Sequence, residues 1–212
     1  MHLPYSPPLP SDDRRALLGR ARQAITQAVC SQSIADFPAP AGRLAEPGGA
    51  FVTIHCASRL RGCVGRTDRT LALAETVAQC AIGAALRDTR FRPIEPAEID
   101  RMSIEISVLS ELQLLAHDEL EAGKHGLVIV RGERRGLLLP QVAAERGWSI
   151  ERFLDETCGK AGLEPGAWRD PETKVLAFTA EIFSEVDFPG QEPQQEPRGG
   201  SLIAAIKKWG SG

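Results

Sequence analysis

The sequence predicts an α+β protein with a mainly antiparallel sheet and helices packed against it. Two pairs of short apolar runs, each pair joined by a turn, are typical of β-hairpins, over residues 50–65 and 125–139. Between them, residues 102–108 alternate apolar and polar side chains, which indicates a strand with one buried face. An order rich in hairpins favours antiparallel pairing, with the helices packed on the sheet.

The first half of the chain is predicted to hold a helix, a hairpin and a second helix. Cap-type residues at 11–13 precede apolar residues at helical spacing, which predicts a helix over about 12–30. A loop rich in Pro and Gly leads to a strand at 50–55, the chain turns at 57–60, and 60–65 runs back as the hairpin partner. Thr70 is then expected to cap a helix that ends near Asp88.

The second half repeats this pattern. The strand at 102–108 is followed by a hairpin of 125–130 and 135–139 with its turn at 132–134. Pro140 ends that strand, residues 141–146 form a short helix, and Ser149 caps a longer helix that Gly162 terminates. Residues 174–186 predict one final strand, which would place Val175, Ala177, Thr179, Glu181 and Phe183 on one face and Leu176, Phe178, Ala180 and Ile182 on the other.

The order hairpin, helix, strand therefore occurs twice, and the second strand of each hairpin opens with Arg-Gly, at 61–62 and 135–136. We expect an internal duplication at the level of structure. The chain divides into a Pro-rich lead-in (1–10), one domain (11–186), a flexible linker (187–200) and a short amphipathic segment (201–212). This last segment could dock back onto the domain or bind a partner, since so short a helix is marginal alone.

Composition limits the function classes. The chain of 212 residues has no stretch of apolar residues long enough for a membrane helix and no signal-peptide pattern at its start, so we expect it in the cytoplasm. Its five scattered cysteines suit reduced thiols, not a disulfide framework or zinc site. A net charge of −3 argues against nucleic-acid binding, although residues 59–92 carry +4 through seven arginines and three acids. That cluster is either a set of solvated side chains or a cleft for an anion.

The segment 60–65 (LRGCVG) is the main candidate for chemistry. Glycine inside a strand costs stability unless a ligand or another backbone comes close, and Gly62 and Gly65 flank Cys63 here. Arg61 lies two positions before Cys63, so both side chains are expected on one face, where the guanidinium would favour the thiolate. The alternative is that Cys63 is a small buried residue.

Few groups could serve such a thiol as proton carriers. His125 and Glu105 are the best candidates, and Glu105 shares the polar face of its strand with Ser103 and Ser107. No metal site is predicted, because no metal-binding spacing is present, and neither phosphate-loop nor dinucleotide fingerprint occurs. The loop at 88–93 (DTRFRP) is expected to pack Phe91 into the core, with ligand contact as the alternative.

These motifs resemble the AmmeMemoRadiSam system protein A family, also called the AMMECR domain. Residues 60–65 resemble its L-R-G-C-[IV]-G signature, and residues 88–93 its D-x-R-F-x-P motif. Further matches follow in the same order at 104–109 (IEISVL), 124–127 (KHGL), 136–143 and 147–163. The resemblance covers about residues 11–186.

The resemblance implies a duplicated α+β fold of two lobes, with the signature strand near the cleft between them. It implies no established activity or cofactor, but it suggests Memo-like and radical SAM proteins as partners. Our first hypothesis is an accessory binding protein whose Arg61, Gly62, Gly65, Arg90 and Ser107, with Cys63 and His125, receive an anionic small molecule or a partner's chain. The alternative is an enzyme with Cys63 as nucleophile or redox thiol and His125 or Glu105 as proton carrier.

Overall fold

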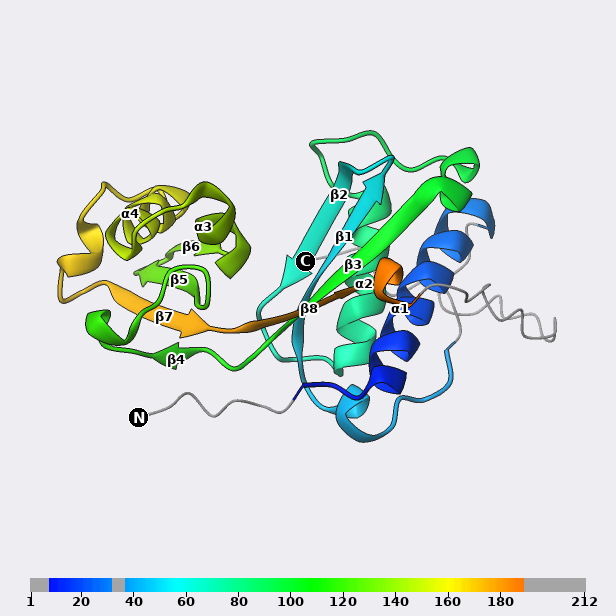
Figure 1. Cartoon of the computed structure of the whole chain (residues 1–212), viewed down its shortest axis with the longest axis horizontal. Helices are drawn as coiled ribbons and strands as arrows, with labels where there is room; N and C mark the ends of the chain where they lie inside the picture. Colours follow the sequence, from blue (N-terminus) through cyan, green and yellow to red (C-terminus); the bar gives the residue numbers. More distant parts are fainter. Residues whose placement is uncertain (1–7, 32–36, 189–212) are drawn as a thin grey trace.

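Two four-stranded antiparallel sheets divide the chain into two lobes that lie side by side (Figure 1). The structure is a computed structural model and describes residues 8–31 and 37–188. The first sheet has the order β2-β1-β3-β8, with β1 Gly49–Cys56, β2 Arg59–Arg66, β3 Met102–Leu109 and β8 Ala180–Ser184. The second has the order β4-β7-β5-β6, with β4 Gln113–Leu114, β5 Gly126–Arg131, β6 Arg134–Leu138 and β7 Lys174–Phe178.

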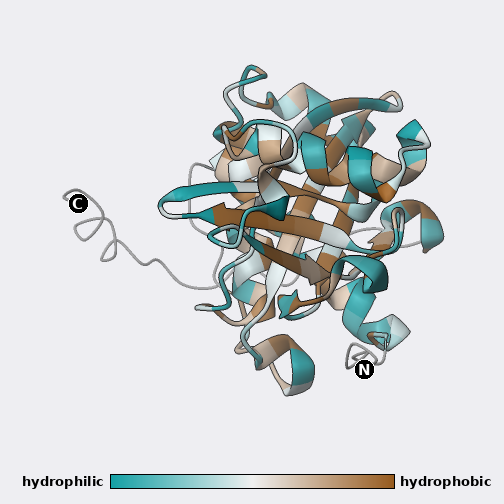
Figure 2. Ribbon diagram, turned by 90° about the vertical axis from the view of Figure 1, so that its left-hand side faces the viewer, coloured by the Kyte–Doolittle hydropathy of each residue, from teal (hydrophilic) through white to brown (hydrophobic). Residues whose placement is uncertain are grey.

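Each lobe packs its helices on one face of its sheet. The first lobe uses α1 Ser11–Thr26 and α2 Leu73–Leu86, and the second uses α3 Pro140–Arg146 and α4 Ile150–Lys160. A π-helical turn at Gln27–Ser31 continues α1, and short 3-10 helices lie at Gly42–Ala45, Pro96–Arg101, His117–Glu119, Ala167–Arg169 and Glu185–Asp187. Figure 2 shows strands coloured largely brown between teal turns, as expected for sheets that carry the cores. The predicted α+β class and antiparallel pairing are confirmed.

The expected duplication holds for the topology. In both sheets the hairpin's first strand is central, its second strand is at the edge, and the next long strand pairs antiparallel on the other side, as β2-β1-β3 and β6-β5-β7. The two Arg-Gly pairs are also equivalent. A Cβ on Gly62 would lie 2.1 Å from the carbonyl oxygen of Ala84 in α2, and one on Gly136 would lie 2.3 Å from the nitrogen of Ala161 after α4. Each glycine thus lets an edge strand pack directly on helix backbone.

The prediction of one final strand over 174–186 is wrong. The segment splits at Thr179 into β7, which joins the second sheet, and β8, which joins the first. A second crossing, from β3 to β4, runs beside it, and the two are bonded together: Ser110 N–H donates to the Thr179 carbonyl and Thr179 N–H to Ser110 Oγ, both at 2.9 Å. The side chains keep alternating between the two faces of the strand through Thr179, so this alternation could not reveal the change of sheet.

The predicted helix starts had different outcomes. Ser149 caps α4 as expected, accepting from Arg152 N–H at 3.3 Å. Thr70 does not cap α2, which begins at Leu73 with Ala72 at its N-cap position. The Thr70 hydroxyl lies before the helix, where it donates to Asp68 at 2.6 Å and accepts from Arg66. Within the predicted lead-in, Leu9 is buried and its N–H donates to Glu181. The predicted linker beyond residue 188 and the segment 201–212 lie outside the described residues.

No helix in the described ranges is long and apolar enough to cross a membrane.

Candidate functional site

Cys63 lies in β2, the edge strand of the first sheet. A two-residue turn joins β1 to β2, with both Ala57 and Ser58 at positive φ (50° and 61°), the backbone of a tight type I′ hairpin. The register pairs Thr53 with Cys63 and Phe51 with Gly65. It shifts near the turn, where Arg61 is the extra residue of a bulge.

Packing accounts for both glycines of the LRGCVG segment. Gly62 faces α2, where a side chain would collide with Ala84, as described above. Gly65 lies on the other face, beneath the ring of Phe51, where a Cβ would come within 2.1 Å of the ring. The approach of backbone and ring, which the sequence could not distinguish from the approach of a ligand, is therefore sufficient to explain them.

The main chain of Cys63 is held from outside the sheet by the loop that follows α2. Its N–H donates to Asp88 Oδ2 at 2.9 Å, and its carbonyl accepts from Arg90 Nη2 at 3.3 Å. Asp88 and Arg90 also form an ion pair at 2.7 Å, and the Asp88 side chain is only 6% exposed. Hydrogen bonds from Arg90 and from the Cys63 backbone hold the pKa of Asp88 well below its usual range. Asp88 and Arg90 thus form hydrogen bonds with the N–H and carbonyl of Cys63, as the backbone of a neighbouring strand would.

Contrary to the expectation from sequence, the Arg61 guanidinium does not pair with the Cys63 thiol. Its guanidinium binds Glu98 through two hydrogen bonds, at 2.8 and 2.9 Å, and donates to the carbonyls of Arg92 and Pro93. The hydrogen bond to Glu98 raises the pKa of Arg61 and lowers that of Glu98. The bulge at Arg61 breaks the two-residue alternation on which the expectation depended.

The segments 60–65 and 88–93 therefore hold each other reciprocally. The arginine of the first binds carbonyls of the second, and the Asp-x-Arg of the second binds the cysteine backbone of the first. Arg90 is the arginine that contacts Cys63, and its side chain remains 57% exposed.

The thiol of Cys63 lies on the face of the sheet that α1 and α2 do not cover. Thr53 Oγ1 donates to its Sγ at 3.4 Å, and the register continues from Thr53 to Glu105 and from Glu105 to Ser184. We call these four residues the Cys63 row; all are half-buried. Sequence analysis identified Cys63 and Glu105 but missed Thr53 between them, which the hairpin register alone could have revealed.

The second lobe contacts the next row along the same face. Phe51 packs against a cluster of Leu109, Val128 and Phe178, drawn from both lobes. Ser107 is buried, and its Oγ accepts from Gln141 Nε2 of α3 at 3.4 Å. Ser107 thus belongs to the lobe contact, one row from Cys63.

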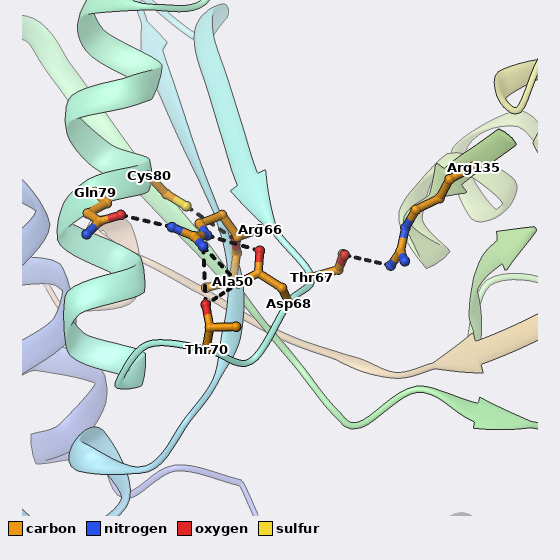
Figure 3. A network of polar contacts seen from close by, with 8 residues as sticks. All are labelled: Ala50, Arg66, Thr67, Asp68, Thr70, Gln79, Cys80 and Arg135. Carbon is orange, nitrogen blue, oxygen red and sulfur yellow. Dashed lines mark hydrogen bonds and ion pairs between the residues drawn. The ribbon is translucent and has the colours of Figure 1, made fainter. Parts of the chain in front are cut away.

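A polar network fixes the end of β2 beside this contact (Figure 3). Arg66 donates to Asp68, Thr70 and Gln79, and the Arg66 hydrogen bond lowers the pKa of Asp68 to about 2. From the second lobe, Arg135 Nη2 donates to Thr67 Oγ1 at 2.8 Å. The end of β2 is thereby tied to both α2 and β6.

His125 lies in the second lobe and is 2% exposed. Its Nδ1 accepts from Glu121 N–H at 3.0 Å, so the neutral ring carries its proton on Nε2. Burial lowers its pKa. The hydrogen bonds of the described residues tie His125 to its own loop and bring it to none of the Cys63 row.

The chemistry available to the Cys63 row is that of a thiol beside a hydroxyl and a carboxylate. Among the residues that the structure describes, no group of three or more His, Cys, Asp or Glu could hold a metal ion. The arrangement can contact a ligand through the thiol, the hydroxyl of Thr53 and the carboxylate of Glu105.

Comparisons with known proteins agree on one family. A family model described as AMMECR1 matches residues 18–183. A protein of Methanothermobacter thermautotrophicus is 39% identical over 186 residues, covering 84% of this chain and 97% of the relative. A protein of Thermococcus kodakarensis is 39% identical over 193 residues, covering 85% and 94%. The crystal structure of an uncharacterised protein from Pyrococcus horikoshii superposes with a TM-score of 0.74 at 38% identity, covering 79% of this chain and 89% of that one.

Proposed function

The chain belongs to the AMMECR1 family, and on that premise we propose that it is a binding component whose Cys63 row receives a partner protein. The AmmeMemoRadiSam resemblance of its motifs makes a Memo-like protein and a radical SAM protein the candidate partners. The partner would reach the row on the sheet face that the helices leave uncovered.

The observation that carries this proposal is the way Cys63 is held. Asp88 accepts from the main-chain N–H of Cys63 and Arg90 donates to its carbonyl, while the half-buried thiol lies on the uncovered face. Binding loses less free energy to ordering when the groups that make contact are already fixed. A side chain positioned in this way is suited to recognition, and Thr53 and Glu105 extend the same surface by two strands.

A second candidate is an enzyme that uses the Cys63 thiol. The hydrogen bond from Thr53 to Sγ favours it, because it holds the sulfur in one position on the uncovered face of the sheet. A general base should lie within hydrogen-bond reach of the proton that it takes. Of the two proposed proton carriers, His125 is bonded within its own loop, and Glu105 lies one strand beyond Thr53. The binding function is therefore the better supported of the two.

The proposal is tested by titrating the purified chain with the Memo-like and radical SAM proteins of the same genome in a calorimeter. Cys63→Ser and Glu105→Gln should each raise the Kd of the complex about tenfold or more, which corresponds to at least about 1.4 kcal/mol of binding free energy. Cys30→Ser and Glu133→Gln make the same chemical changes at exposed positions elsewhere and should bind as wild type. If neither protein binds, or if the Cys63 row variants bind normally, the proposal is wrong.

The enzymatic alternative is tested by the pH profile of iodoacetamide labelling at Cys63. A midpoint well below that of a free thiol, about 8.5, and its rise in Thr53→Val, would favour the enzyme. A profile like that of exposed Cys30 would exclude an activated nucleophile.

A further inference from the structure

A polar hollow of about 150 Å³ lies where the two lobe crossings meet the start of α2. It is several times larger than the space that one water needs, roughly 15 Å³. Its lining includes Arg43, Arg69, Leu73, Ser110 and Thr179, and it shares no residue with the Cys63 row. No part of the binding function proposed above involves it.

Arg69 has far more hydrogen-bonding capacity than its contacts use. A guanidinium carries five N–H donors. Within the described part of the chain, Arg69 makes one long hydrogen bond, to the Leu109 carbonyl at 3.4 Å, and one ion pair at 3.9 Å. The partner in that ion pair, Glu111, has a side chain that is 71% exposed, so solvent screens the interaction. The guanidinium can therefore accept an anionic ligand without losing a strong internal bond.

The other charges around the hollow also favour an anion. Arg43 supplies a second guanidinium, which donates to the Pro8 carbonyl at 3.4 Å. Of the two carboxylates in the lining, Glu181 is already paired with Arg14 at 2.8 Å and accepts from Leu9 N–H. The remaining carboxylate, Glu46, belongs to an exposed residue. In the lining, therefore, two guanidinium groups stand beside the carboxylate of Glu46 and a second carboxylate, Glu181, that already has a cation of its own.

We propose that this hollow binds the phosphate or carboxylate group of a small anionic molecule, with Arg69 as the main contact and Arg43 as the second. Guanidinium groups bind both kinds of oxyanion through paired, charge-assisted hydrogen bonds. Ser110 and Thr179 line the same hollow, so the ligand also contacts both chain crossings.

The test measures thermal unfolding of the full chain with inorganic phosphate and, separately, with malonate, each against sodium chloride of equal ionic strength. An anion at about ten times its Kd should raise the Tm by roughly 3–5 °C, because it binds only the folded state. A response to phosphate alone, or to malonate alone, identifies which oxyanion the site prefers.

Arg69→Gln should abolish the rise and Arg43→Gln should reduce it. Arg59→Gln removes the same charge from an exposed arginine outside the hollow and should respond as wild type. Circular dichroism checks that each variant is folded, and amide NMR shifts of Ser110 and Thr179 on titration locate the binding directly. The proposal is wrong if neither anion raises the Tm, if Arg69→Gln still responds fully, or if Arg59→Gln loses the response equally.

Discussion

Asp88 accepts the backbone N–H of Cys63 at 2.9 Å, across 25 positions of sequence, and so takes the place of a strand beside the edge of the first sheet. The thiol that defines the candidate site therefore depends on a loop outside its own hairpin. This relationship gives the first prediction.

Asp88→Ala should lower the free energy of unfolding by about 1–3 kcal/mol, because it removes a hydrogen bond to a charged acceptor and leaves Arg90 without its partner. Urea unfolding measures the loss, and hydrogen exchange should speed up at the Cys63 amide. Asp118→Ala, at an exposed position, is the control and should change stability by less than about 0.5 kcal/mol. An unchanged exchange rate at Cys63 would show that the loop does not protect this edge.

Low pH should reduce the free energy of unfolding, partly through the Asp88 carboxylate. The pKa of Asp88 is lower in the folded state than in the unfolded chain, where it is about 3.9. The unfolded state then binds more protons as the pH falls, so the stability from Asp88 is complete above about pH 5 and is lost progressively below it. Unfolding of wild type and Asp88→Ala between pH 6 and pH 2 should show the two free energies converging; parallel curves would contradict this.

Gly62→Ala should destabilise the first lobe by about 1–3 kcal/mol or more, because the new methyl group would press on the backbone of α2. Gly136→Ala should do the same in the second lobe, where the methyl group would lie 2.3 Å from the Ala161 nitrogen and 2.6 Å from the Thr157 carbonyl oxygen of α4. Gly159→Ala is the matched control: nothing lies within 4 Å of its Cβ, and alanine should favour the helix. Chemical unfolding of the three variants decides whether packing requires these glycines.

Arg61 and Glu98 should be energetically coupled by about 1–2 kcal/mol in a double-mutant cycle of Arg61→Gln and Glu98→Gln. Their side chains are only 18% and 21% exposed, and the guanidinium bonds both carboxylate oxygens. A coupling near zero would mean that Arg61 is available for a ligand, as the sequence suggested. The cycle is measured by urea unfolding at neutral pH.

His125→Leu should cost about 0.5–1.5 kcal/mol, since it removes the hydrogen bond that the Glu121 N–H donates to Nδ1. His125→Asn keeps an acceptor oxygen near Nδ1 and should cost less. Because burial lowers the pKa of His125, wild type should also lose stability as the pH falls below about 6.5, the usual value for histidine, and neither variant should share that part of the loss. Equal pH dependence of stability in wild type and both variants would contradict a lowered pKa for His125.

Local pattern was enough to predict most elements. Both hairpins, the alternating strand β3 and the cap at Ser149 depend on neighbouring residues, and all were found. Two errors have physical causes that no local pattern contains. The bulge at Arg61 shifts the strand face by one residue, and Thr179 separates strands of different sheets while the alternation continues.

The candidate site was predicted only in part. Cys63 and Glu105 do share one row, but the partner of Arg61 is Glu98, and His125 belongs to the other lobe. Such pairings join residues far apart in sequence, and several side chains could have competed for each. Periodicity shows which way a side chain points within its own strand, but not which distant loop it meets.

The pair of crossings at Ser110 and Thr179 limits how the halves of the molecule can move. Thr179 is the single residue between β7 and β8, and its amide and carbonyl are both committed to Ser110. Any rotation of one half against the other must be absorbed by the dihedral angles of very few peptide units. Such a connection resists bending, so the two halves should tumble in solution as one stiff body instead of opening freely.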